Sequence, residues 1–184
     1  MLSLLSSNSA STTKGAMVPI QKISLSSSGG FVFSNIPQIY QDLFISVSAR
    51  GDYASSMDVV LLSWPYTQNH SYTTMRALGS SSMTIDHFRG STAYGVYLNS
   101  IPAATSASNT FGYINIHIFD YSNTTRFKNV IATQAFDLNT AGGGVSYTTG
   151  TKNTTTAITE LSIGGGNAGI SAGSIATLYG IRGA

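Results

Sequence analysis

The sequence contains no cysteine, and this absence removes several chemistries at once. Thiolate zinc sites, cysteine nucleophiles and disulfide frameworks are excluded, while the redox compartment is left open. A chain of 184 residues buries roughly 70% of its unfolded surface on folding, so it needs no covalent or metal cross-link. We therefore expect stability to come from an ordinary hydrophobic core.

Charge is also scarce, at 9% of residues against roughly 25% in an average protein. Nine lysines and arginines against seven acids give a net charge of +2 and a pI near 8.9. The basic residues are scattered, and only Arg126 and Lys128 are close in sequence. Because a polyphosphate ligand needs several cations on one surface, we expect no nucleic-acid partner.

Long apolar runs and helical periodicity are missing as well. No apolar stretch approaches the ~20 residues that a membrane span requires, so we expect no membrane insertion. The first residues lack the cationic start of a secretory signal and are not expected to be one. No longer window keeps a 3.6-residue period, which argues against helices.

In place of charge, the chain is rich in serine, threonine, asparagine and glycine, and it has ten tyrosines. Its hydrophobic content of 42% is ample for a core and excludes wholesale disorder. Such a composition predicts a neutral, hydrogen-bonding surface. Because a soluble monomer usually carries more charge than this, we expect a subunit buried in an assembly or displayed outside cells.

Short apolar runs of period two, separated by turn residues, predict an all-β chain. The clearest strand is Asp42 to Ala49, where Leu43, Ile45 and Val47 share one face. Many short strands predict a sandwich rather than alternating strands and helices, so we expect a jelly-roll-like antiparallel β-sandwich of roughly ten strands. The predicted strands are residues 18–25, 30–33, 42–49, 59–64, 72–78, 84–88, 93–98, 110–119, 127–136, 156–163 and 175–181.

The chain is expected to form a single sandwich domain over residues 17–184, preceded by an extended arm over residues 1–16. The arm is rich in serine and threonine but carries Leu2, Leu4 and Leu5. Two interpretations stay open: an untethered tail, because chain ends are usually disordered unless they are docked, or an arm that packs against another subunit. We favour an arm whose leucines pack on a neighbouring subunit.

Residues 33–51 combine a turn with a strand and a well-known tripeptide. Pro37 cannot donate to a ladder, so we expect Pro37 to Tyr40 to form a corner where the chain crosses between sheets. Arg50, Gly51 and Asp52 spell an adhesion motif, but glycine and aspartate are also ordinary turn residues. We predict that Arg50 anchors the strand-to-loop corner that follows Ala49 by bonding to carbonyls or a carboxylate.

No pattern of catalytic or cofactor-binding residues emerges. The glycine-rich segments 142–144 and 164–169 lack the helix, acid or lysine that phosphate-binding loops require, and we interpret them as connections between strands. His70, His87 and His117 are isolated, without metal-ligand spacing or a nucleophile elbow. We therefore predict no enzymatic activity, no catalytic residues, no cofactor and no metal.

Sugar binding without cleavage is a separate hypothesis, because aromatic rings beside amide and hydroxyl groups suit carbohydrates. Trp64, Tyr66 and Tyr72 are the candidate stacking residues, with Tyr94 and Tyr97 as further aromatics. The alternative is that these rings fill the core or an interface, which tyrosine and tryptophan do routinely. Host-surface polysaccharide is the partner this hypothesis implies.

Two segments carry a family resemblance. Residues 33–43 read Phe-Ser-Asn-Ile-Pro-Gln-Ile-Tyr-Gln-Asp-Leu, and residues 172–181 read Ala-Gly-Ser-Ile-Ala-Thr-Leu-Tyr-Gly-Ile, with Thr-Ala-Ile-Thr at 156–159 a strand earlier. The ensemble resembles a widespread family of small virion proteins of tailed bacteriophages. The resemblance implies a place in the virus particle rather than a reaction. The first 16 residues and residues 182–184 depart from the family pattern.

Together these observations predict a non-enzymatic structural component of a tailed-phage virion. We favour a tail appendage, fibre or tail-tip protein that forms a homotrimer and contacts other virion proteins. A capsid decoration, or cement, protein is the first alternative, with the arm of residues 1–16 clamping neighbouring shell subunits. A host-surface glycan-binding module is the second alternative.

Overall fold

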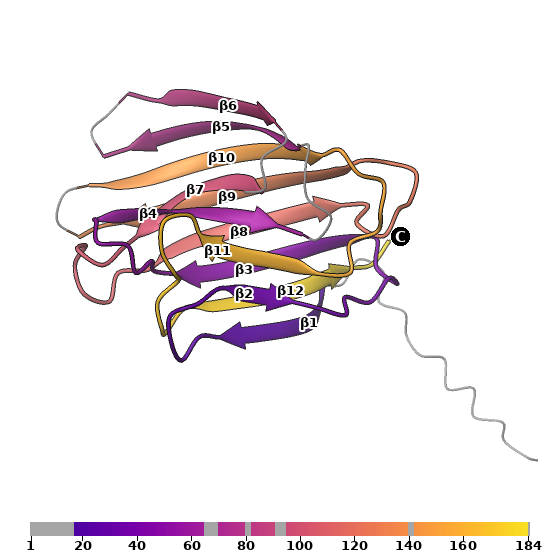
Figure 1. Cartoon of the computed structure of the whole chain (residues 1–184), viewed down its shortest axis with the longest axis horizontal. Coiled ribbons are helices and arrows are strands. Elements are labelled where there is room, and N and C mark those ends of the chain that lie inside the picture. The colour runs from indigo at the N-terminus through magenta and orange to yellow at the C-terminus, as the bar shows by residue number, and fades with distance from the viewer. Residues whose placement is uncertain (1–16, 65–69, 80–81, 91–94, 140–141, 184) are drawn as a thin grey trace, which may run out of the picture.

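The computed structural model describes residues 17–64, 70–79, 82–90, 95–139 and 142–183, and its regular structure in these ranges is β-strand (Figure 1). In chain order the strands are β1 (Met17–Ser24), β2 (Phe31–Phe33), β3 (Asp42–Ala49), β4 (Met57–Ser63), β5 (His70–Leu78), β6 (Thr84–Gly90), β7 (Val96–Pro102), β8 (Gly112–Phe119), β9 (Lys128–Asp137), β10 (Gly143–Lys152), β11 (Leu161–Gly165) and β12 (Ile175–Ile181).

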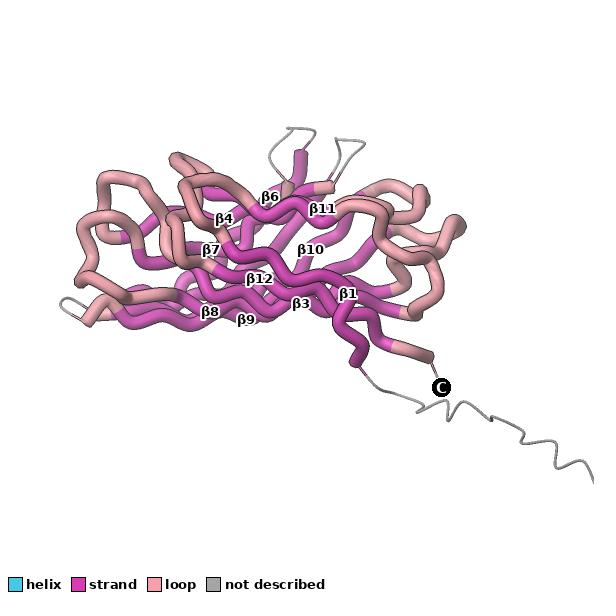
Figure 2. Tube along the Cα trace, turned by 90° about the horizontal axis from the view of Figure 1, so that it is seen from below, coloured by secondary structure: helices cyan, strands magenta, loops and turns pink. Residues whose placement is uncertain are grey.

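The strands form two antiparallel sheets that face each other as layers (Figure 2). The larger sheet has the order β1-β12-β3-β8-β9-β10-β5-β6, and the smaller sheet has the order β2-β11-β4-β7. The all-β sandwich predicted from alternation is confirmed, with twelve strands in the described ranges rather than roughly ten.

The strand order identifies the sandwich as a jelly roll. Eight strands form this core. Four neighbouring strands of the larger sheet, in the order β1-β12-β3-β8, pack against the four strands of the smaller sheet, in the order β2-β11-β4-β7. Along the chain, each of these eight strands is followed by one in the opposite sheet, except that β4 and β7 both lie in the smaller sheet. This is the two-sheet, eight-stranded arrangement that defines a jelly roll.

Two hairpins widen the larger sheet beyond the eight-stranded core. The pair β9 and β10 follows β8, and the pair β5 and β6 continues the sheet to its far edge (Figure 1). In the sequence, β5 and β6 lie between β4 and β7, and β9 and β10 lie between β8 and β11. The added strands widen the larger sheet. The side of this sheet that faces away from the smaller sheet is therefore a broad surface.

The core lies between the sheets because alternate residues of the strands point inward. Leu43, Ile45 and Val47 of β3 are fully or almost fully buried, as their predicted common face requires. A single cluster joins them to buried residues of both sheets, including Phe31, Phe33, Leu62, Leu98, Ile114, Ile116, Leu161, Ile163 and Leu178.

Three strand predictions differ from the structure. β10 was not predicted, because its glycines and threonines form a weak strand signal, yet Gly150 is needed there: a Cβ would lie 2.8 Å from the Val96 side chain. Residues 156–160 are not strand, although the backbone N–H of Ile158 donates to the carbonyl of Tyr121 and its side chain is buried. The strand predicted over 93–98 is centred later, at β7.

Candidate functional site

The outer face of the larger sheet is almost without charge. On β3, β8, β9, β10 and β5, all described in full, the outward positions hold no lysine, arginine or glutamate. On these five strands only Asp42 and Asp137 carry charge on this face, and both lie at strand ends. The edge strands add one cation each, Lys22 on β1 and Arg89 on β6. The surface predicted from composition is thus concentrated on one broad face, which we call the outer face.

Large apolar and aromatic side chains are exposed on adjacent strands at one end of this face. We call the following five the outer patch: Tyr113 (63% exposed), Val145 (59%), Tyr147 (41%), Met75 (42%) and Ile85 (64%). Met75 lies directly opposite Tyr147 on β10 and Ile85 on β6. Tyr113 and Val145 each lie opposite Ala135 on β9, so the five side chains form one continuous surface.

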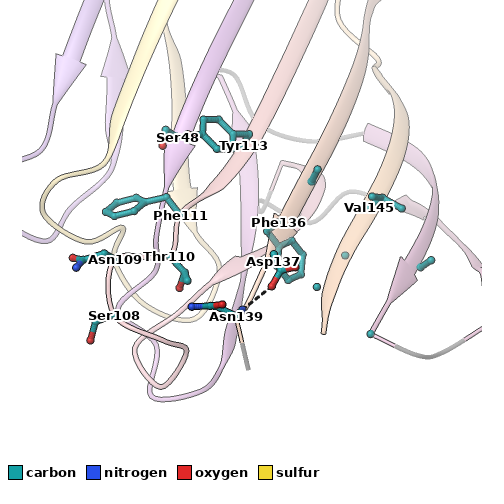
Figure 3. A pocket seen from close by; sticks show the side chains of 15 residues that line it. Ser48, Ser108, Asn109, Thr110, Phe111, Tyr113, Phe136, Asp137, Asn139 and Val145 are labelled. Carbon is teal, nitrogen blue, oxygen red and sulfur yellow. Dashed lines mark hydrogen bonds between the residues drawn. The ribbon is translucent and has the colours of Figure 1, made fainter. Parts of the chain in front are cut away.

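An open groove of about 980 Å³ borders the outer patch at the ends of β8, β9 and β10 (Figure 3). Phe111 and Tyr113 supply two aromatic rings, and Asn109 and Asn139 supply amides from the neighbouring loops. Both asparagines have positive φ, 62° and 58°, which asparagine tolerates better than most residues. The carboxylate of Asp137 accepts a hydrogen bond of 2.6 Å from the Asn139 backbone N–H.

The strand pattern over residues 110–119 carries a sequence signal for this groove. In the predicted strand over residues 110–119, alternation places Phe111, Tyr113 and Asn115 on one face. A mixed aromatic and polar face does not by itself reveal which side meets solvent. The isoleucines on the opposite face are fully buried, and this places the mixed face outside. The loop asparagines had no sequence signal, since only folding brings residues 109 and 139 together.

The predicted corner at Pro37 and Tyr40 connects β2 in the smaller sheet to β3 in the larger one. The Tyr121 hydroxyl donates to the Pro37 carbonyl and accepts from the Tyr40 backbone N–H at 3.4 Å. Burial raises the pKa of Tyr121, so the hydroxyl keeps its proton for this contact. The crossing between sheets lies where the sequence predicted it.

Arg50 lies at the opposite end of β3 from the Pro37 corner, directly after Ala49. Its guanidinium donates to the carbonyls of Ala107, Ser106 and Thr110 at 2.8–3.1 Å, as the predicted anchoring role requires. The next residues are also held within the fold: the Gly51 N–H donates to Pro102, and the Asp52 N–H donates to Gly169. The tripeptide is therefore part of the framework and does not present an accessible adhesion loop.

Trp64, a predicted stacking residue, is a core residue in the structure. It is only 5% exposed, and the ammonium of Lys152 lies 4.9 Å from its ring centroid. The Lys152 Nζ also donates to the Trp64 carbonyl at 2.9 Å. A buried ring has no free face for a sugar, so the structure does not support a stacking role for Trp64. Tyr66 lies outside the described residues.

Tyr72 packs on the inner side of the sheet extension. Its ring stacks with Phe88 of β6 at 5.5 Å between centroids and with Tyr97 of β7 at 5.7 Å. This aromatic stack closes the space between the β5–β6 hairpin and the smaller sheet. Tyr72 and Tyr97 are half-buried, and Tyr94 lies outside the described residues.

His70 and His117 lie in different surroundings. His117 Nε2 lies 3.0 Å from Asp42 Oδ2, and its ring stacks on Phe119 with centroids 4.0 Å apart. His70 stacks on Tyr72 and is buried, which lowers its pKa. Among the described residues, no three side chains of histidine, cysteine, aspartate or glutamate gather as a metal site.

Comparisons with known proteins add no assignment: no protein-family model matches the chain, and no similar curated protein or solved structure was found. Leu2, Leu4 and Leu5 of the predicted arm lie outside the described residues. Within the described ranges there is no helix that could cross a membrane.

Proposed function

We propose that this protein is a non-enzymatic structural subunit of a tailed-bacteriophage particle, in which the outer face of the larger sheet is its contact surface. The favoured position is a tail appendage, fibre or tail tip, and the favoured state is a homotrimer that also contacts other virion proteins. The observation that carries the proposal is the outer patch on an almost uncharged face.

The chemistry of the outer face matches that of protein interfaces. Interface cores are depleted in charge and enriched in tyrosine and methionine, which Tyr113, Tyr147 and Met75 supply. Contiguous exposed apolar patches on soluble proteins commonly mark interaction sites. With few charges to keep copies apart, association through this face is favoured over a dispersed monomer.

The position in a phage particle is supported by the sequence resemblance together with the places of its two segments in the fold. Residues 33–43 make the crossing from β2 to β3, and residues 172–181 contain β12, which pairs with β1 and β3. Both segments therefore maintain the jelly roll itself. A sandwich with a broad, eight-stranded sheet suits a structural protein that packs against other proteins of a particle.

Electron microscopy of phage particles labelled with antibody against this protein tests the proposal. Label on the tail is the expected result. Label confined to the faces of the head would instead assign the protein to capsid decoration, the alternative that uses the same fold and outer face. Particles that carry no label, together with protein found only in the soluble fraction of infected cells, would contradict both.

Glycan binding at the groove is a second candidate function, now carried by different residues from those predicted. The exposed ring of Tyr113, the half-buried ring of Phe111 and the amides of Asn109 and Asn139 line the same groove (Figure 3). Rings stack on the apolar faces of sugars while amides bond to hydroxyls. The small number of charges in the lining favours a neutral sugar over a charged one.

A glycan array tests this second candidate. Wild-type protein is expected to bind neutral polysaccharide from the host surface, and Tyr113→Ala is expected to abolish the signal while the protein stays folded. Phe127→Ala is the matched control, because Phe127 is also exposed (49%) but does not line the groove. An array without hits, or equal binding by Tyr113→Ala, would remove the candidate.

A further inference from the structure

A second open depression, of about 390 Å³, lies on the outer face near its β6 edge, at the opposite end of β10 from the groove (Figure 1). Its lining comes from β5, β6 and β10. By strand alternation six of the lining side chains point to the outer face, and we call them the cationic pocket: Ser71, Thr73, His87, Arg89, Thr149 and Thr151. Four carry hydroxyls and two are basic, so the pocket offers both hydrogen bonds and positive charge.

The side chains of the cationic pocket lie in two cross-strand rows. Arg89 on β6 lies directly opposite Ser71 on β5, and Ser71 lies opposite Thr151 on β10. His87 and Thr73 make the same pair in the next row, followed by a threonine of β10. Side chains that lie opposite each other in an antiparallel pair have Cβ atoms about 5 Å apart. One small ligand can therefore contact a basic group and hydroxyls of both rows.

The two basic side chains have no acid beside them. Both Arg89 and His87 are exposed, and neither side chain has a hydrogen bond or ion pair with another described residue. Asp86 precedes His87, but it points to the other face of β6 and pairs with Arg76 at 2.7 Å. Of the two acids on the outer face, one lies on β3, five strands away, and the other at the far end of β9. The local charge therefore favours an anion.

The hydroxyls of the pocket suit a ligand that carries hydroxyls of its own. Thr151 Oγ1 donates to Asn129 Oδ1 at 2.8 Å, which extends the row of Arg89 to β9. Because its proton is taken by this bond, the Thr151 oxygen can only accept from a ligand, as it would from a sugar O–H group. The hydroxyls of Ser71 and Thr73 can donate or accept.

We propose that the cationic pocket binds a negatively charged sugar. The Arg89 guanidinium holds the carboxylate or phosphate of the sugar, with His87 beside it, and the hydroxyls of β5 and β10 bond to the hydroxyls of the ring. The planar fork of arginine matches either anion with two parallel hydrogen bonds. A neutral sugar would leave Arg89 without a partner, and a bare inorganic anion would leave the hydroxyl rows unused. The pocket is separate from the groove, and the inference does not depend on the proposed function.

A glycan array that pairs each acidic glycan with its neutral counterpart tests the proposal. The acidic members carry uronic acids, sialic acids or phosphorylated sugars. Wild-type protein is expected to bind acidic members about tenfold or more tightly than their counterparts, as hydrogen bonds to a charged group allow. Hits with carboxylate or with phosphate identify the anion, and either supports the proposal. No binding, or equal binding of acidic and neutral members, would overturn it.

Arg89→Gln locates the site, because it removes the charge at an exposed position and should leave Tm unchanged. This variant is expected to lose the preference for acidic glycans. Lys22→Gln is the matched control: it removes the same charge from the same face at the opposite edge strand and should keep the preference. An equal loss in both variants would indicate general charge attraction and overturn the assignment.

Thr73→Val tests the hydroxyl rows without a change in charge. It replaces a hydroxyl with a methyl group of similar size and is expected to weaken the binding of acidic glycans about threefold to tenfold. Unchanged binding would contradict the sugar contacts. Tyr113→Ala, which alters the groove, should keep the acidic-glycan binding. A loss in that variant would place the acidic sugar in the groove instead and overturn the proposal.

Discussion

The ring of Tyr40 lies directly over Gly180, so close that a Cβ on the glycine would be 2.3 Å from the Tyr40 Cγ. Tyr40 belongs to the corner after Pro37, and Gly180 belongs to β12. The segments 33–43 and 172–181 therefore meet in space. Their pattern is explained by packing at the end of the sandwich, where Tyr40 covers the core.

Gly180→Ala tests this contact. The added methyl group must displace the Tyr40 ring, so we expect a loss of about 1–3 kcal/mol in the free energy of unfolding, measured by urea denaturation. Gly164→Ala is the matched control, because Gly164 is also in a strand but has nothing within 4 Å of its Cβ position. It should change stability far less.

The double variant Tyr40→Ala with Gly180→Ala shows whether the two positions act together. If they do, the combined loss is smaller than the sum of the single losses, because the methyl group occupies space that the ring has left. Strict additivity would contradict the packing explanation.

Arg50→Lys is expected to destabilise the protein by about 2–4 kcal/mol. The flat guanidinium bonds to several carbonyls of residues 104–110 at once, and an ammonium group cannot reproduce that geometry. Arg89→Lys on the edge strand β6 is the control, since Arg89 is exposed. Thermal melts of the two variants make the comparison, and equal melting temperatures would rule out the anchoring role.

Stability is expected to rise between pH 8 and pH 9.5 because of Lys152. Burial lowers the pKa of Lys152 from 10.5 to about 8, so in this window the unfolded chain holds a proton that the folded chain has released. The free energy of unfolding then increases with pH, by at most about 1.4 kcal/mol per pH unit. Burial also lowers the pKa of Lys128, which adds a change of the same sign.

Urea titrations at pH 8, 8.75 and 9.5 measure this slope. The range stops there because burial raises the pKa of Tyr121, and ionisation of the unfolded tyrosine at higher pH lowers stability again. Lys152→Met should reduce the slope, whereas Lys22→Met, at an exposed position on β1, should leave it unchanged. A slope that is flat in the wild type would contradict the burial effect.

The fold class could be predicted from sequence because alternation of apolar and polar residues identifies β-strands locally. Residues 42–49 alternate strictly and form β3. Pro37 lies in the predicted crossing between the sheets, and the Arg50 guanidinium bonds to loop carbonyls as predicted. β10 escaped prediction because its place depends on pairing with β9 and β5, which lie far away in the sequence. Tertiary pairing there overrides the weak strand preference of glycine.

The candidate sites were less predictable, since exposure is a property of the folded chain. Trp64 and Tyr113 are both large aromatics within or beside strands, yet one is buried and the other is the most exposed ring of the outer patch. Gly51 and Gly165 both pack against Asp58, although no local spacing connects the three residues. Sequence alone therefore indicated the residue types of a neutral surface but not their positions.

The mass of the protein in solution tests the contact role of the outer face most directly. Light scattering after size exclusion should give wild-type protein a mass three times the 19.3 kDa of one chain. Tyr147→Lys places a charge in the outer patch and should give monomers, while Val32→Lys, at an exposed position of β2 in the smaller sheet, should not. A wild-type mass of one chain, or intact trimers of Tyr147→Lys, would contradict the account.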